Sequence, residues 1–201
     1  MRIIATDLPD VFIIEMKVFS DDRGFIKELW NAPRYLNQGL GVPSVQTNFS
    51  RSRKGVVRGL HYQEPHGQGK LVTVLAGEVF DVAVDIRKGS PTFGRWTGTV
   101  LTGDNHHQLW IPPGFAHGFS VLSEQADFLY QCTAPYDPNC EHAIRWNDPA
   151  IGIDWKVSDP VIAKKDLAAP LLSEARVLPP YYPLPPLIVT TGRDADGKPT
   201  G

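Results

Sequence analysis

The sequence predicts an all-β domain, a sandwich or barrel of short strands with jelly rolls among its possible forms. Alternation of apolar and polar residues dominates the chain, and neither helical heptads nor an internal repeat is present. Turn-forming dipeptides separate the short apolar runs. The 201 residues include 18 Gly and 18 Pro, so that proline exceeds its usual share of roughly 5%. The length suits one compact domain with a core of its own.

The clearest predicted strand covers residues 79–86, with the sequence VFDVAVDI. Large apolar side chains alternate there with two aspartates and an alanine, a pattern that predicts a half-buried strand. The apolar run 71–75 comes just before it. Because only a short turn containing Gly77 separates the two runs, they are predicted to form a hairpin.

The other predicted elements are short and are bounded by turn signals. Further strands are predicted at residues 45–49, 56–63, 108–111, 118–122 and 127–133. Short helices are predicted at residues 32–38 and 163–168. The proline-dense run 179–188 favours an extended chain, and residues 191–201 have a disordered composition. We therefore predict a domain over residues 1–178 and a proline-rich, partly disordered tail over residues 179–201.

Charge and composition exclude several classes of function. The net charge of −2 argues against a nucleic-acid-binding or membrane-surface protein, which would carry a basic patch. No stretch approaches the ~20 apolar residues that span a bilayer, and the N-terminus lacks a secretory apolar region. Cys132 and Cys140 are expected to be unpaired thiols in a reducing compartment. We expect a cytoplasmic protein.

Two motifs place histidines where a metal-binding barrel would hold its ion. The segment 112–117, PPGFAH, has the pattern P-x-G-x-x-H and resembles the second motif of the cupin barrels. The first cupin motif aligns with His61, Gln63, Lys70 and Gly77. Because an ammonium at Lys70 would repel a divalent cation where a carboxylate would bind it, no catalytic metal is expected.

Three longer segments resemble one family. They are RGLHYQ at residues 58–63, the run 79–94, and residues 109–119. Together they are similar to the dTDP-4-dehydrorhamnose 3,5-epimerase family, which includes epimerases acting at C3 only or C5 only, and the resemblance covers roughly residues 10–172. It implies a cupin-type jelly-roll homodimer that acts on dTDP-4-keto-6-deoxyglucose without metal or other cofactor.

The resemblance also implies roles for particular residues. It implies a catalytic base at His61, a base-orienting carboxylate at Asp166, a lysine at Lys70 and a tyrosine at Tyr130. The substrate contacts that it implies are Arg23, Glu28, Gln46, Asn48, Arg58, His117 and Tyr136, and the strand from Arg23 to Glu28 tends to come from the partner subunit. One departure leaves the geometry around Asp166 open: Ala163 and Lys164 stand where relatives commonly have a serine and an acidic residue.

The chemistry of a 4-keto sugar explains why these residue types are needed. A ketone at C4 makes the hydrogens at C3 and C5 removable, and an imidazole such as that of His61 suits the base. A cation such as Lys70, with His117 a weaker second candidate, would stabilise the enolate oxygen. Inversion also needs a proton from the opposite face, for which Tyr130 is the candidate. In a regular strand Arg58 and His61 point to opposite faces, so a shared site requires a bulge or bend at Gly59.

Several alternatives remain open from the sequence. The enzyme could invert C3 alone, or it could be a nucleotide-sugar ketoisomerase on the same kind of barrel. A metal-dependent cupin such as a dioxygenase, and a non-catalytic sugar-binding module, are further alternatives. Each candidate residue also has an ordinary structural interpretation, such as a core tyrosine for Tyr130 or a solvated lysine for Lys70.

Overall fold

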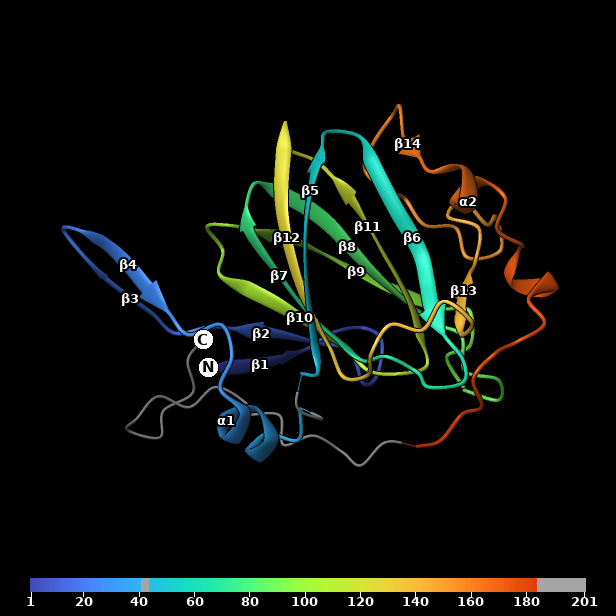
Figure 1. The fold of residues 1–201 in the computed structure, drawn as a ribbon, viewed down its shortest axis with the longest axis horizontal. Coiled ribbons are helices and arrows are strands. Elements are labelled where there is room, and N and C mark those ends of the chain that lie inside the picture. Colours follow the sequence, from blue (N-terminus) through green and yellow to red (C-terminus); the bar gives the residue numbers. More distant parts are fainter. Residues whose placement is uncertain (41–43, 184–201) are drawn as a thin grey trace.

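The computed structural model describes residues 1–40 and 44–183, and two β-sheets packed face to face make up most of it (Figure 1). The first sheet has the order β1 (Arg2–Ala5), β2 (Phe12–Glu15), β10 (His107–Ile111), β7 (Lys70–Ala76), β12 (Gln125–Cys132) and β5 (Gln46–Arg53). The second has the order β13 (Glu141–Ala143), β6 (Val56–Gln63), β11 (Phe115–Val121), β8 (Glu78–Asp85) and β9 (Trp96–Thr102), and β14 (Val161–Ile162) pairs with β6. The predicted cupin-type jelly roll is confirmed.

Helix is scarce, as predicted. The described helices are α1 (Ala32–Asn37), α2 (Lys164–Leu167) and a 3₁₀ turn at Leu172–Glu174. Helix α1 begins where the side chain of Asn31 accepts a hydrogen bond from the backbone N–H of Arg34, and Pro33 occupies its first turn. No helix in the described part of the chain is long and apolar enough to cross a membrane.

The space between the sheets holds an apolar core and, at one end, polar side chains. Val72, Leu109, Phe119 and Phe128 are buried there together. Alternation along the strands sends polar residues to the same inner faces, so that Lys70 shares a face with Val72 and Asp81 shares one with Ala83. The same period that builds the core therefore also brings charged groups inside it.

Strand β8 corrects a prediction made from its alternation. Both of its faces are buried, so the half-buried strand predicted at 79–86 is wrong. The face with Val82 and Val84 packs under the segment 144–178, which crosses the outside of the second sheet with Ile144, Trp155 and other apolar residues. The face with Asp81 lies inside the barrel.

The hairpin predicted around Gly77 is also wrong. Strand β7 pairs with β10 and β12 in the first sheet, whereas β8 pairs with β9 and β11 in the second. Gly77 has φ +80°, and a side chain there would collide with the carbonyl oxygen of Gln125. The glycine thus marks a crossing between sheets instead of a turn within one.

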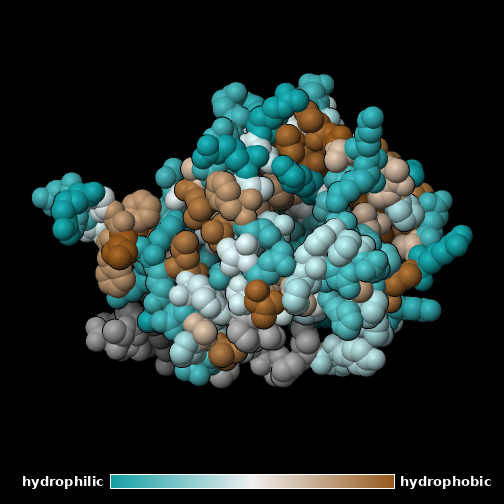
Figure 2. Space-filling view, in the orientation of Figure 1, coloured by the Kyte–Doolittle hydropathy of each residue, from teal (hydrophilic) through white to brown (hydrophobic). Residues whose placement is uncertain are grey.

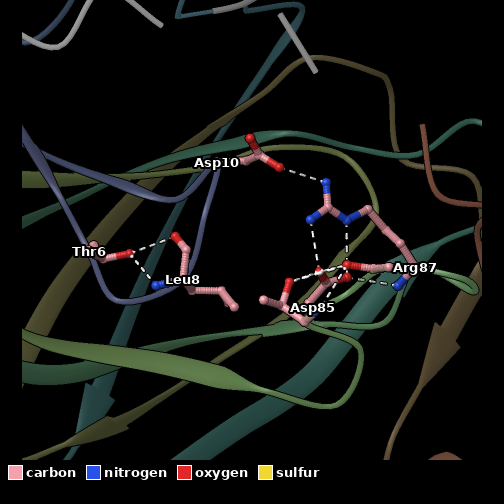
Figure 3. A network of polar contacts seen from close by, with 7 residues as sticks. Thr6, Leu8, Asp10, Asp85 and Arg87 are labelled. Atoms are coloured by element: carbon pink, nitrogen blue, oxygen red, sulfur yellow. Dashed lines mark hydrogen bonds and ion pairs between the residues drawn. The ribbon is translucent and has the colours of Figure 1, made fainter. Parts of the chain in front are cut away.

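A buried ion cluster fixes the barrel next to the turn 112–114 (Figure 3). Arg87 donates to both carboxylate oxygens of Asp85, at 3.0 and 2.8 Å, and to Asp10 at 2.8 Å. Burial raises the pKa of Asp85, but the hydrogen bonds from Arg87 and two hydroxyl groups outweigh it and hold that pKa below its ordinary value. The cluster thereby joins the loop at Asp10 to the segment that follows β8.

The described part of the tail lies against this cluster. The backbone of Lys88 bonds to Pro179 and Tyr181, and the Tyr181 ring lies 5.0 Å from the guanidinium of Arg87. Residues 184–201, including the segment predicted to be disordered, lie outside the described residues. The domain boundary at residue 178 stays a prediction.

A two-stranded hairpin of β3 (Val18–Asp21) and β4 (Gly24–Lys27) projects from the barrel (Figure 1). Its tip is polar and its base is apolar, as Figure 2 shows. Phe19, Phe25 and Ile26 are exposed there by 56%, 57% and 72%. Such a contiguous apolar surface is typical of an interaction site.

Candidate active site

A polar cavity opens between the two sheets, next to the start of β7 and the end of β6. It consists of two adjoining hollows of about 330 and 250 Å³. Both hollows are bordered by the same five side chains: His61, Lys70, Tyr130, Glu141 and Lys165. The four residues predicted to be catalytic all border this cavity, because Asp166 lines the second hollow.

His61 and Asp166 form a hydrogen-bonded pair at the cavity wall. The distance from His61 Nε2 to Asp166 Oδ1 is 2.7 Å, and the backbone N–H of Gly59 approaches the other carboxylate oxygen at 3.5 Å. Burial raises the pKa of Asp166, but His61 and the Gly59 N–H outweigh it and keep that pKa below its ordinary value. An ionised carboxylate fixes the ring and leaves the other ring nitrogen available to act as a base.

The departure at Ala163 and Lys164 does not displace this carboxylate. Ala163 precedes α2 without a side-chain cap, and Asp166 is only 2% exposed. The local geometry that the sequence left open therefore supports an orienting position for Asp166.

A bulge at Gly59 brings Arg58 to the same side of β6 as His61. His61 lies opposite His117 and Arg58 lies opposite Phe119, so that β6 has one residue more than β11 across this interval. Gly59 has φ +129°, and a Cβ there would lie 2.6 Å from the Cα of Gly118. The predicted bulge is confirmed, and both Arg58 and His61 line the cavity.

Lys70 is a buried ammonium without a carboxylate hydrogen-bond partner in the described part of the chain. It is 8% exposed, and within the described residues its Nζ donates to the carbonyl oxygen of His61, at 3.5 Å. Burial lowers the pKa of Lys70, against weaker opposing effects of Cys132, Asp81 and Glu141. Strand β6 carries His61 and strand β7 carries Lys70, in different sheets, and both side chains border the same cavity.

His117, predicted as a nucleotide or diphosphate contact, is buried and lines the second hollow. Its Nε2 is 3.0 Å from Asp81, and both residues are buried. Burial lowers the pKa of His117, and nearby Lys70 and His61 lower it further against the opposing effect of Asp81. His117 and Lys70 therefore line the same hollow.

Three further predicted residues line the cavity from the first sheet. Tyr130 is half-buried, and burial raises its pKa, so that its hydroxyl keeps its proton. Gln46 and Asn48 share a face of β5, where the Gln46 amide donates to Asn48 at 3.0 Å. Tyr130 thus lies on a different sheet from His61, as a proton donor on the opposite face of the sugar would need to.

The mouth of the cavity carries a network centred on Glu141. This carboxylate accepts hydrogen bonds from Tyr136 and Lys165, both at 3.0 Å. The backbone N–H of Tyr136 in turn donates to Gln46 at 2.8 Å. Tyr136, predicted as a substrate contact, is therefore held at the rim.

Arg23 and Glu28 do not reach the cavity of their own chain. Arg23 lies at the tip of the β3–β4 hairpin with an 89% exposed side chain paired to Asp21. Glu28 follows the hairpin and pairs with Arg34 at 2.8 Å. Neither of them borders either hollow.

Sequence reasoning missed several residues of the cavity. Glu141 lies among turns without periodicity, and no local signal identified it. Lys165 is the neighbour of Asp166 in the recognised motif and could have been found there. Asp81, which pairs with the cavity residue His117 but does not itself line either hollow, was visible as a carboxylate in an apolar strand, but the strand was predicted to expose one face.

Among the described residues, no group of three or more His, Cys, Asp or Glu side chains converges as a metal-binding site would. Gln63, which occupies one position of the cupin metal motif, binds backbone instead. Its amide donates to the carbonyl oxygens of His66 and Pro135, and it accepts from Asp137 N–H at 2.9 Å. It thereby holds the loop beside the mouth.

Comparisons with known proteins agree on one family. The profile of the dTDP-4-dehydrorhamnose 3,5-epimerase family matches residues 5–174. A dTDP-4-dehydrorhamnose 3,5-epimerase of Salmonella typhimurium is 55% identical over 178 residues, which cover 87% of this chain and 97% of the relative. A dTDP-4-dehydrorhamnose 3-epimerase of Streptomyces niveus is 38% identical, with 90% of each chain covered.

Solved structures give the same result. The crystal structure of a dTDP-6-deoxy-D-glucose-3,5-epimerase from Legionella pneumophila, in complex with dTDP-4-keto-L-rhamnose, matches with a TM-score of 0.88. The two proteins are 54% identical, and the match covers 90% of this chain and 99% of that one. On this evidence, the chain belongs to the dTDP-4-dehydrorhamnose 3,5-epimerase family.

Proposed function

We propose that this protein inverts C3 and C5 of dTDP-4-keto-6-deoxyglucose by removing and replacing the protons next to the C4 ketone. The observation that carries the proposal is the convergence of the His61–Asp166 pair, at 2.7 Å, with the buried ammonium of Lys70 in one cavity. This combination suits a base and an oxyanion stabiliser for one carbonyl compound.

Each catalytic step has a candidate residue. His61, oriented by Asp166, takes the proton from the carbon beside the ketone, and the electron pair of the broken C–H bond moves onto the C4 oxygen as the enolate forms. Lys70 stabilises that oxygen, with neutral His117 close by. Tyr130 then donates a proton to the opposite face of the carbon, which inverts it. No metal or other cofactor takes part in the proposed steps.

Binding of the nucleotide diphosphate is proposed for the polar residues around the catalytic group. Arg58 faces the cavity without a carboxylate partner among the described residues, which suits it to bind a diphosphate. Gln46 and Asn48 would contact the nucleotide, and Tyr136 would close over it at the rim.

We further propose a homodimer in which Arg23 and Glu28 complete the partner's cavity. The exposed apolar base of the β3–β4 hairpin supports such an exchange. Co-expression of Arg23→Ala and His61→Ala chains tests it, because a mixed dimer would contain one cavity with both native residues. Restored activity is expected, and a mixture as inactive as its components would contradict the shared site.

A cytoplasmic location stays a prediction.

Hydrogen exchange with the solvent tests the reaction itself. In D₂O, the enzyme should introduce deuterium at both C3 and C5 of dTDP-4-keto-6-deoxyglucose, and His61→Ala should abolish both. A native enzyme that introduces deuterium at neither C3 nor C5 would contradict the proposal. Full activity of His61→Ala would instead contradict the assigned base.

The second candidate is inversion of C3 alone. The 38% identity with the Streptomyces niveus 3-epimerase keeps it open, whereas the 55% identity with a 3,5-epimerase favours action at both carbons. Deuterium found at C3 only would establish the second candidate.

A further inference from the structure

Arg58 is held by a hydroxyl group, unlike the arginines of this protein that bind carboxylates. Its Nε and Nη2 donate to the Ser52 Oγ, at 3.2 and 3.1 Å. No ion pair of Arg58 is found within residues 1–40 and 44–183. On the outer face of the same strand as Ser52, Arg51 pairs with Asp127 at 2.6 Å.

Ser52 lies in a position that constrains this arginine. It is 6% exposed and sits on the inner face of β5, in the first sheet, whereas Arg58 belongs to β6 in the second. The two hydrogen bonds therefore join the sheets at the edge of the cavity. Since Ser52 is neutral, the full charge of Arg58 stays available to an anionic ligand.

We infer that Ser52 is a positioning residue that aims Arg58 at the diphosphate of the substrate without neutralising it, an inference that rests on the proposed function of Arg58. A free arginine side chain loses rotamer entropy when it is ordered. Prior ordering by Ser52 lowers the part of this cost that falls on binding. A carboxylate in the same place would order Arg58 equally well but would compete with the diphosphate.

The test is a set of Ser52 variants assayed for dTDP binding by calorimetry and for turnover. Ser52→Ala should weaken dTDP binding and raise KM by about tenfold, because hydrogen bonds to a charged group are lost, while kcat stays within about twofold. Ser52→Thr keeps the hydroxyl and should restore both. Ser52→Asp should bind dTDP more weakly than Ser52→Ala. The exposed Ser173→Ala is the matched control and should leave every value unchanged.

A double-mutant cycle with Arg58→Gln shows whether Ser52 acts through Arg58. If it does, Ser52→Ala has no further effect on dTDP binding once Arg58 is replaced. An unchanged Kd for Ser52→Ala, a loss of kcat at constant KM, or a full additional loss in the Arg58→Gln background would overturn the inference. Thermal melting of each variant separates these outcomes from misfolding.

The binding assay also distinguishes the inference from the proposed function. Native protein that binds dTDP but exchanges no sugar hydrogens in D₂O would contradict the epimerase proposal, and the Ser52 series would still decide the role of Ser52. Native protein that does not bind dTDP would overturn the inference as well.

Discussion

Two buried cations lie on either side of the turn 112–114, and their surroundings are opposite in kind. Arg87 is 3% exposed, binds the carboxylates of Asp85 and Asp10, and lies with its guanidinium near the rings of Phe115 and Tyr181. Lys70 is almost equally buried, at 8%, but its Nζ donates a long hydrogen bond to a carbonyl oxygen and pairs with no carboxylate among the described residues.

The difference separates a structural cation from a functional one. A buried charge is tolerated when paired carboxylates compensate for the loss of water, as they do around Arg87. Within residues 1–40 and 44–183 no carboxylate pairs directly with the ammonium of Lys70, and burial lowers its pKa in spite of Cys132, Asp81 and Glu141 nearby. An ammonium without a direct carboxylate partner can stabilise an anion that forms during a reaction, such as an enolate oxygen.

The largest expected effect is on stability, from the variant Arg87→Met. It leaves Asp85 and Asp10 without their cation, so the free energy of unfolding should fall by about 3–5 kcal/mol. Urea denaturation followed by circular dichroism measures this. The exposed pair gives the control: Arg51→Met should cost less than about 1 kcal/mol. If Arg87→Met and Arg51→Met lost equal stability, the buried ion pairs of Arg87 would be no more important for stability than the surface pair of Arg51.

A smaller effect is expected in the pH dependence of kcat. Since burial lowers the pKa of Lys70, its ammonium should lose its proton below the ordinary lysine value of about 10.4, and kcat should decline as the pH rises through that lowered value. The groups that face Lys70 are Cys132, Asp81, Glu141 and the carbonyl of His61.

The variant Lys70→Arg keeps a charge up to about pH 12, so its alkaline decline should move to higher pH even though its turnover is reduced. Cys132→Ala serves as the control: the alkaline decline should persist and, because the Cys132 thiolate raises the pKa of Lys70, should if anything move to lower pH. An alkaline decline that vanishes in Cys132→Ala would assign the titration to the thiol instead.

The smallest effect concerns the tail. Tyr181→Leu removes the ring that lies 5.0 Å from the guanidinium of Arg87, and should cost about 0.5–1 kcal/mol of stability with kcat unchanged. Tyr182→Leu, at a residue that is 71% exposed, should have no measurable effect. A loss of activity in Tyr181→Leu would mean that the tail supports the cavity and not only the barrel.

Local pattern predicted much of the barrel, and long-range pairing explains what it missed. Alternation identified β8 and β12, and β6 was also predicted although the bulge at Gly59 interrupts its alternation. Strand β9 was missed since Gly98 interrupts its pattern, and that glycine is needed because the Phe80 ring packs against it. The Gly77 turn was misassigned because the choice between a hairpin and a sheet crossing depends on partners far along the chain.

The candidate site was predictable where a short sequence motif by itself fixed the positions of its side chains. In a regular strand Arg58 and His61 would point to opposite faces, so a shared site required a bulge at Gly59, and the bulge is present. The pair of His117 with Asp81 was not predicted, because it depends on the second sheet being covered on its outside. Glu141 comes from a turn-rich segment that only the fold carries to the mouth.

Paired measurements on Lys70→Met show whether Lys70 is a functional or a structural cation. Methionine keeps the apolar stem and removes the charge, so turnover in the D₂O exchange assay should fall by about 10²–10³-fold. The free energy of unfolding at neutral pH should stay within about 1 kcal/mol of the native value or rise, because the charge that is removed is buried and pairs directly with no carboxylate in the described part of the chain. Turnover that is retained, together with a loss of stability as large as that of Arg87→Met, would show that Lys70 is another structural cation and would contradict the account.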